Sequence, residues 1–152
     1  MKTYFKHRII TAVFLFLLVP SISFSDDIPA GLRDTCGLSP DFTIQDSSGK
    51  PDNHIAFLGI LTGQWDKKLD SYVIVESIAS NGKFEGYYYW GVYENWGIKE
   101  AGCMQVSGKI KKNKMKFRSS SASQSYTLKD NSITARFVRN GRTTKGKFTK
   151  LD

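Results

Sequence analysis

Apolar and polar residues alternate strictly through the second half of the chain, and this pattern constrains the fold more than any other feature. In residues 114–118, Met115 and Phe117 alternate with charged side chains, and the same period of two continues through 132–139 and 142–150. Successive side chains of a β-strand point to opposite faces, so this period separates an apolar face from a charged one. The pattern predicts an antiparallel sheet with one face in water.

Turn signals divide the rest of the chain into short segments of the same kind. The strongest is Asn140-Gly141, because a two-residue type I′ hairpin needs a positive φ at both positions. No segment after residue 25 shows a sustained helical period. We expect an all-β fold, an antiparallel up-and-down barrel of about eight strands, because closure removes exposed strand edges. The expected strands are residues 57–66, 71–79, 84–93, 102–110, 114–119, 123–129, 132–139 and 142–150.

The first residues have the features of an export signal. A basic head precedes an apolar run over residues 9–19, which is typical of a signal-peptide core and short for a bilayer span. The small residues Ser23 and Ser25 predict cleavage after Ser25, and no later apolar stretch is long enough to cross a membrane. We expect a secreted or periplasmic protein without stable membrane insertion after cleavage. A retained membrane anchor is the alternative.

The expected organisation follows from this signal. Residues 1–25 form the signal peptide, residues 26–55 form an irregular N-terminal extension, and residues 56–152 form one β-barrel domain. Cys36 and Cys103 suggest one disulfide in an exported protein, with two unpaired buried thiols as the alternative. Two thiols without clustered histidines do not indicate a metal site, and we expect no cofactor.

The charge of the chain bears on its partners. The formal net charge is +8, and a positive charge attracts anionic surfaces or polymers weakly over long range. Export argues against nucleic acid, and the lysines are spread over many segments rather than clustered in one. We therefore interpret them as solvated strand faces and expect no nucleic-acid partner.

Two stretches resemble a known family. L-T-G-x-W at 61–65, followed by Leu69, Ser71 and a β-branched strand, and then G-x-F-x-G-x-Y ending at Tyr88, resembles the opening strands of the avidin and streptavidin family. The end, TTKGKFTKLD, resembles the closing strand of that family. The resemblance implies a β-barrel whose mouth binds a small molecule, with Ser71 and Tyr88 among the binding residues.

The sequence departs from this family at other binding positions. Lys67 stands where the family has a ligand-binding Asn, and no Trp follows Trp96, although late tryptophans pack the ligand in that family. We therefore expect a ligand other than biotin. Gly63-x-Trp65 with Arg142 is also similar to the calycin pattern, which implies that Trp65 closes the barrel base and that Arg142 covers it. The run from YYYWG to NWGIKEAG also resembles a poorly characterised exported bacterial β-domain, which supports the fold.

The run EGYYYWGVYENWG concentrates aromatic side chains on one expected strand. Tyr88 and Trp90 share the face that the family-like pattern places inside, where they either fill the core or contact a ligand. Tyr87 and Tyr89 have the opposite parity, so we expect them on the outer surface. There they either pair across strands or form, with Tyr93, an aromatic patch for protein or glycan contact.

The remaining candidates are weaker. Trp96 lies in a glycine-bounded loop, where it either covers a ligand as a lid or stacking platform or plugs the barrel mouth. His54 lies in a polar segment and is expected at the surface. The carboxylates have no spacing typical of an acid/base pair, and no nucleophile motif is present. We therefore do not expect an enzyme.

The sequence thus predicts an exported, non-catalytic binding protein that holds a small, partly apolar ligand in a barrel mouth. Ser71, Tyr88 and Trp90 would line that mouth, and Trp96 would close it. One alternative is an interaction or inhibitor module that binds an extracellular protein or glycan through Tyr87 and Tyr89. The other is an accessory domain of an exported hydrolase system.

Overall fold

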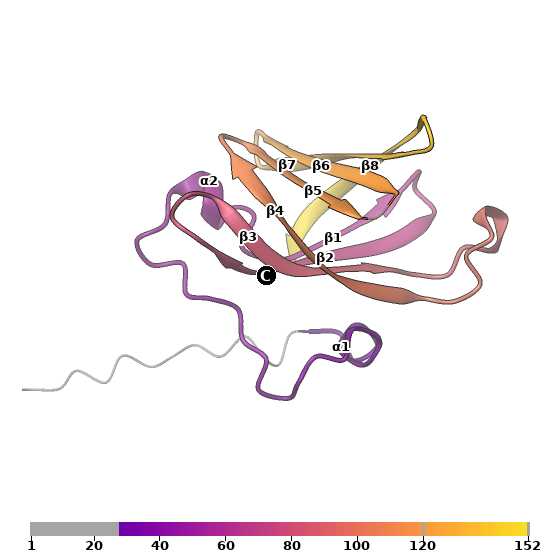
Figure 1. The fold of residues 1–152 in the computed structure, drawn as a ribbon, viewed down its shortest axis with the longest axis horizontal. Coiled ribbons are helices and arrows are strands. Elements are labelled where there is room, and N and C mark those ends of the chain that lie inside the picture. The colour runs from indigo at the N-terminus through magenta and orange to yellow at the C-terminus, as the bar shows by residue number, and fades with distance from the viewer. Residues whose placement is uncertain (1–27, 120, 152) are drawn as a thin grey trace, which may run out of the picture.

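The computed structural model describes residues 28–119 and 121–151, and the expected signal peptide lies outside them. The described residues form the strands β1 (Gly59–Trp65), β2 (Leu69–Ile78), β3 (Lys83–Trp90), β4 (Gly102–Lys111), β5 (Lys114–Ser119), β6 (Ala122–Lys129), β7 (Ser132–Arg139) and β8 (Arg142–Leu151). Each strand pairs antiparallel with the next, and β8 pairs back onto β1, so the barrel of eight strands is closed (Figure 1). This confirms the expected fold.

The strand boundaries lie close to those expected from the sequence. β1 begins at Gly59 because Phe57 still belongs to a helical turn, in which its N–H bonds to His54. The turn between β7 and β8 has positive φ at both central residues, 49° at Asn140 and 75° at Gly141. These are the values that a type I′ hairpin requires, so this turn is also confirmed.

A continuous apolar cluster fills the barrel interior around Trp65. Trp65 is 1% exposed, and its indole lies 5.2 Å from the Phe148 ring and 6.1 Å from the Tyr126 ring, centre to centre. Gly146 stands opposite Trp65 in the β1–β8 register, and a Cβ at Gly146 would come within 3.0 Å of the indole. The close packing of this region therefore requires a glycine at this position of β8.

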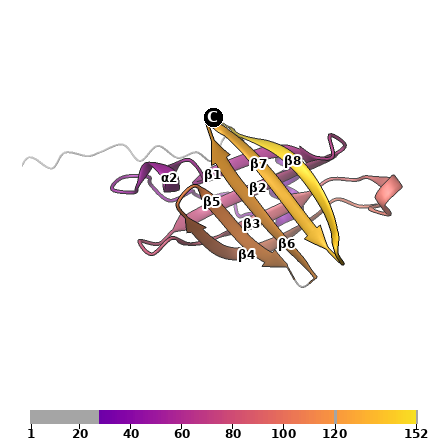
Figure 2. The ribbon, with the colours of Figure 1, turned by 90° about the horizontal axis from the view of Figure 1, so that it is seen from above.

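A short helix closes one end of the barrel (Figure 2). This helix, α2 (Asp52–Ile55), precedes Phe57, whose side chain is entirely buried. Lys150 at the end of β8 donates a hydrogen bond from Nζ to the carbonyl of Ile55 at 3.1 Å. His54 is 9% exposed, so its expected surface position is wrong. The reason is that α2 is packed against the barrel end, with His54 beside the turn that contains Gly82.

The N-terminal extension is more regular than expected. It contains a second helix, α1 (Ala30–Cys36), which lies against the outer face of β3 and β4 (Figure 1). Leu32 and Leu38 are buried there against Ile60 and Ile74, which point outward from β1 and β2. A helix of 7 residues is too short to show a helical period in the sequence. Its stability comes from this packing and from its attachment to the barrel.

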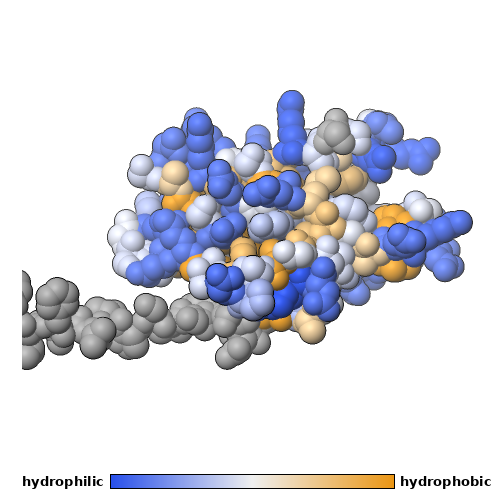
Figure 3. Space-filling model, turned by 60° about the horizontal axis from the view of Figure 1, so that its bottom comes forward, coloured by the Kyte–Doolittle hydropathy of each residue, from blue (hydrophilic) through white to orange (hydrophobic). Residues whose placement is uncertain are grey.

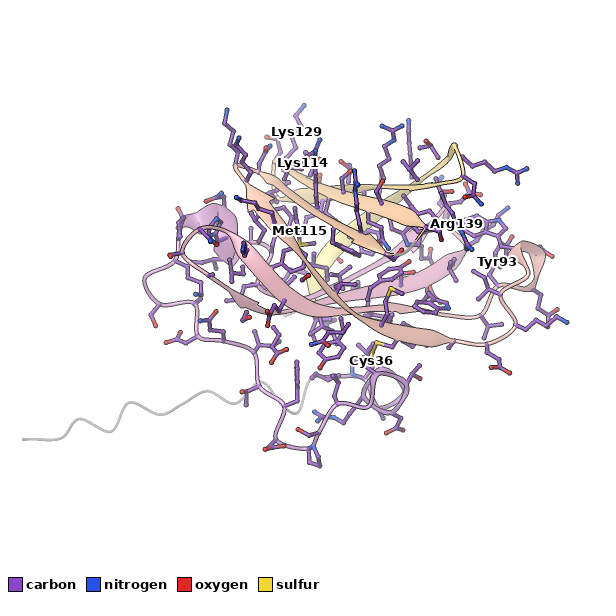
Figure 4. The ribbon with its side chains drawn as sticks, in the orientation of Figure 1. Cys36, Tyr93, Lys114, Met115, Lys129 and Arg139 are labelled. Atoms are coloured by element: carbon purple, nitrogen blue, oxygen red, sulfur yellow. A yellow bond between two sulfur atoms is a disulfide. The ribbon has the colours of Figure 1, made fainter. Side chains whose placement is uncertain are left out.

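That attachment is a disulfide between Cys36 at the end of α1 and Cys103 on β4 (Figure 4). The expected pairing is therefore confirmed, and the bond indicates an oxidising environment. In the described part of the chain, neither helix has the length and apolar character needed to cross a bilayer. The surface that carries the extension shows scattered apolar areas between charged side chains (Figure 3).

Removing the disulfide should lower stability without changing the barrel. The bridge joins cysteines 67 positions apart, and closing so long a loop contributes about 4 kcal/mol in the chain-entropy model. We expect the double variant Cys36→Ser, Cys103→Ser to lose about that much free energy of unfolding in urea while keeping a β-rich circular dichroism spectrum. An unchanged free energy of unfolding would show that the bridge does not constrain the unfolded chain.

Candidate functional site

The barrel is open at the end opposite α2. A cavity of about 1240 Å³ lies there, and all eight strands contribute side chains to it. Within the described chain it is lined by apolar and aromatic side chains below and by polar and basic ones at the rim: Trp65, Leu69, Tyr88, Trp90, Asn95, Trp96, Ile98, Met104, Ser119, Ser121, Ala122, Gln124, Phe137, Arg139, Asn140, Arg142, Thr143 and Thr144. We call this cavity the mouth.

Two buried hydrogen bonds form the floor of the mouth. Trp65 Nε1 donates to the phenol oxygen of Tyr88 at 2.9 Å. The Tyr126 hydroxyl donates to Oε1 of Gln124 at 2.7 Å. Because a phenol that accepts a hydrogen bond keeps its own O–H, Tyr88 remains able to donate. The floor is therefore a polar group of side chains set among aromatic rings.

Two buried polar atoms of this floor make no hydrogen bond of ordinary geometry with the described residues, although both side chains lie close enough to the Tyr88 phenol to lower its pKa. They are Oγ of Ser71 and Nε2 of Gln124, whose side chains are 0% and 2% exposed. An unpaired buried polar group costs about 1–3 kcal/mol, so a folded protein rarely keeps one without a reason. Gln124 lines the mouth itself, whereas Ser71 is buried beside the Tyr88 phenol and does not line it.

Burial also keeps the floor uncharged. Burial raises the pKa of Tyr88, although hydrogen bonding with the side chains of Ser71, Trp65 and Gln124 opposes that rise. The pKa of Tyr126 is raised well above its usual range by burial and by the proximity of Tyr88. Both phenols therefore stay neutral at ordinary pH, where they act as hydrogen-bonding groups rather than as bases.

Trp90 forms one wall of the mouth. Its ring lies 5.8 Å from that of Tyr88, tilted by 33°. A Cβ at Gly102, which pairs with Trp90 across β3 and β4, would come within 2.3 Å of the Trp90 ring. The missing side chain of Gly102 therefore leaves the space against β4 that the Trp90 ring occupies. Sequence reasoning missed this role of Gly102.

The rim of the mouth is polar and basic. Arg139 at the end of β7 and Arg142 at the start of β8 are both exposed, and they stand opposite each other in the strand register (Arg139 in Figure 4). No carboxylate is among the residues that line the mouth, all of which lie in the described part of the chain. Trp65, which the calycin pattern places at the base, lines the mouth instead, at the end of the barrel opposite α2. Arg142, expected over Trp65, is a rim residue.

The loop between β3 and β4 stands beside the rim. It carries a short 3-10 helix, η2 (Glu94–Trp96), in which Trp96 is 42% exposed and faces the mouth. Tyr93 is half-buried and contacts the Trp96 ring edge-on at 5.3 Å (Tyr93 in Figure 4). Tyr93 thus supports Trp96 and does not belong to an outer patch with Tyr87 and Tyr89.

The outward tyrosines of β3 are not a bare patch. Tyr87 and Tyr89 have the parity opposite to Tyr88, as expected, but both are half-buried in the apolar cluster outside the barrel. The ring of Tyr87 meets Phe42 of the extension at 5.9 Å, and that of Tyr89 meets Tyr72 at 5.6 Å. The partner of this surface is therefore largely the extension of the same chain, which sequence parity alone could not reveal.

Sequence reasoning also missed Gln124. It lies in the polar segment SSSASQS, near the start of the expected strand 123–129, and the observed strand β6 begins at Ala122. Ala122, Gln124 and Tyr126 share the buried face of that strand. The alternation of this strand was the available signal. Gln124 lies two positions before Tyr126, so the two side chains share one face of the strand.

No family model, curated protein or solved structure matches the chain. The closed eight-strand antiparallel barrel is consistent with a calycin-like architecture. In residues 28–119 and 121–151, no three His, Cys, Asp or Glu side chains lie close enough together to hold a metal ion.

The two phenols of the floor predict a loss of stability at alkaline pH. Because folding raises both pKa values, the neutral forms stabilise the fold below about pH 10, and this contribution is lost as the pH rises above that value. Tyr126→Phe removes one ionisable group. We expect its free energy of unfolding, measured in urea from about pH 9 to 12, to fall less steeply with pH than that of the unchanged protein. Parallel curves would contradict the assignment.

Proposed function

We propose that this chain is an exported, non-catalytic binding protein that holds a small, partly apolar molecule in the mouth. One observation carries the proposal. Gln124 lines the open mouth, and its buried Nε2 makes no hydrogen bond of ordinary geometry with the described residues. A ligand that accepts a hydrogen bond from this group would remove the cost of leaving it unpaired.

The floor favours a ligand with an acceptor at its inner end. Gln124 offers an N–H group, and the Tyr88 phenol, which already accepts from Trp65, offers its O–H. Ser71 is buried beside the Tyr88 phenol, so it would support Tyr88 and would not contact the ligand itself. A carbonyl or similar acceptor placed between these donors would be held in an environment that contains little water, where hydrogen bonds are strong.

The walls and the rim favour the rest of such a molecule. Trp90, Met104 and Phe137 provide an apolar lining, as is usual for small-molecule sites. The rim arginines would attract an acceptor or anionic group that reaches the solvent. Trp96 stands where it would cover a bound molecule. The mouth has room for a drug-sized ligand, since such sites usually occupy about 300–1,000 Å³.

The resemblance to the avidin family agrees with this proposal in part. Ser71 and Tyr88, which match binding positions of that family, lie together at the floor. Lys67, which replaces the family's Asn, is exposed in the turn between β1 and β2 and does not line the mouth. We therefore propose an avidin-like binding mode with a ligand other than biotin. The disulfide supports export into an oxidising compartment.

Catalysis is not part of the proposal. A general base must reach its substrate in an ionisable form near the working pH. The two phenols of the floor have raised pKa values, and no carboxylate or histidine lines the mouth in the described chain. The groups that face the mouth are suited to holding a molecule in a fixed orientation.

Native mass spectrometry of the protein, purified from the host that exports it, tests this function. We expect a bound small molecule, and we expect Gln124→Leu to lower its affinity about tenfold or more by removing a buried donor. Gln105→Leu is the matched control, because it makes the same chemical change at an exposed position of β4. It should leave the affinity unchanged.

Two results would contradict the function. The first is that the purified protein carries no small molecule and binds none from an extract of the medium in which its host grows. The other is an equal loss of binding in the Gln124→Leu and Gln105→Leu variants while both keep the circular dichroism spectrum of the unchanged protein. In the second case the ligand would not be bound at the floor of the mouth.

A further inference from the structure

The outer face of β4 to β8 collects basic side chains that the sequence spreads over five strands. All of them are exposed, and several project from the sheet away from the barrel, as Lys114 and Lys129 show in Figure 4. They lie on solvated strand faces, as expected, but the strand register brings them together on one face of this half of the molecule. The basic face, as we call it, consists of Lys109, Lys111, Lys114, Lys116, Arg118, Lys129, Arg136, Lys145 and Lys147.

The strand register aligns these side chains in rows. Lys109 pairs with Lys116, Lys116 with Ser125, Ser125 with Arg136, and Arg136 with Lys145. Neighbouring strands lie about 4.8 Å apart, so this row runs for about 19 Å across five strands. Four of its five positions are basic, and the fifth is a hydroxyl.

A second row lies beside the first. It begins with Lys111 opposite Lys114 and ends with Lys147, and the positions between them are Thr127 and Thr134. Residues of one face are about 6.6–6.8 Å apart along a strand, so the two rows are close enough for one extended molecule to contact both. The basic face thus repeats positive charges and hydroxyl groups in two dimensions.

Nothing in these strands balances that charge. No Asp or Glu occurs in β4 to β8, all of whose residues are described. Like charges directly opposite each other on a sheet destabilise it, and Lys109–Lys116, Lys111–Lys114 and Arg136–Lys145 are all such pairs. The arrangement costs the fold some stability, and an anionic partner bound to this face would offset that cost.

A groove on this face follows the first row. It has a volume of about 560 Å³, and Lys109, Lys116, Ser125 and Arg136 are among the residues that line it. Arg136 also donates a hydrogen bond to the Thr143 hydroxyl at 3.2 Å, which holds its guanidinium on the face. The face therefore offers a shallow track with charges and hydroxyls along it.

We propose that the basic face binds an acidic polysaccharide, one that carries carboxylate or sulfate groups. Two features favour it. The oxidising environment indicated by the disulfide is the one in which such polymers occur outside cells. Serine and threonine hydroxyls stand between the charges, where they can bond to sugar hydroxyls or to the acidic groups. The face is separate from the floor of the mouth, so this inference does not depend on the proposed small ligand.

Two other polyanions fit the face less well. Proteins that bind single-stranded nucleic acid stack bases on aromatic side chains, but the aromatic residues of these strands, Phe117, Tyr126, Phe137 and Phe148, pack inside the barrel. Surface binding to a membrane usually inserts apolar side chains, whereas the positions around the basic side chains are polar except for the half-buried Val138, and the outward Leu151 packs in the apolar cluster near the extension.

The test compares binding to heparin and to polygalacturonate, a sulfated and a carboxylated chain, with neutral dextran as the control polymer. The full chain should bind at least one acidic polymer, with an affinity that falls as salt rises, and should not bind dextran. Lys116→Glu with Arg136→Glu should lower that affinity about tenfold or more. Lys68→Glu with Lys99→Glu makes the same change of net charge at exposed loop positions off the basic face, and should lower it about twofold or less.

The basic-face variant should melt no lower than the unchanged protein, because it removes like-charge pairs. If it does not fold, Lys116→Gln with Arg136→Gln provides the same comparison without charge reversal. Equal losses in the two charge-reversed variants would overturn the inference, since net charge alone would then explain binding. Tighter binding to a single-stranded oligonucleotide or to phosphatidylglycerol vesicles than to either acidic polysaccharide would overturn the choice of partner.

Discussion

The position of Trp65 connects the closure of the barrel with the chemistry of its mouth. Trp65 is the last residue of β1, and it pairs with Leu69 on one side and with Gly146 on the other. Its ring packs against other aromatic rings of the core, and its N–H donates to the Tyr88 phenol. A shift in the β1–β8 register would therefore disturb the floor of the mouth as well as the core. The polar group at the floor is held in place by the same residue that fills the barrel.

The two halves of the barrel wall differ in what covers them. The outer face of β1 to β3 carries apolar and aromatic side chains, and the extension with α1 lies over it (Figure 1). Beyond the part of β4 that α1 covers, the outer face of β4 to β8 is uncovered and basic. The tyrosine-rich run on β3 serves both sides of the first half, because Tyr88 points into the mouth while Tyr87 packs under the extension. The proposed small ligand and the proposed polysaccharide thus use different surfaces of one rigid barrel.

The sequence predicted the features that depend on local pattern. Alternation predicted the strands, Asn140-Gly141 predicted a hairpin, and two cysteines in a chain that begins with the features of an export signal predicted the disulfide. It did not predict contacts made by segments far apart in the chain. His54 is buried only because α2 packs on the barrel end, and Tyr87 is covered only because the extension folds back over β3. The basic face escaped notice for the same reason, since strand register, which a single sequence does not reveal, brings its charges together.

The central claim is that the floor of the mouth holds the polar end of a small ligand. A crystal structure of the protein, purified from its natural host, tests this most directly. We predict density for an organic molecule in the mouth, with an acceptor atom within hydrogen-bond distance of both Nε2 of Gln124 and the phenol oxygen of Tyr88. The claim would be contradicted by a mouth filled with the side chains of Trp90 and Trp96, with Nε2 of Gln124 bonded to another group of the protein.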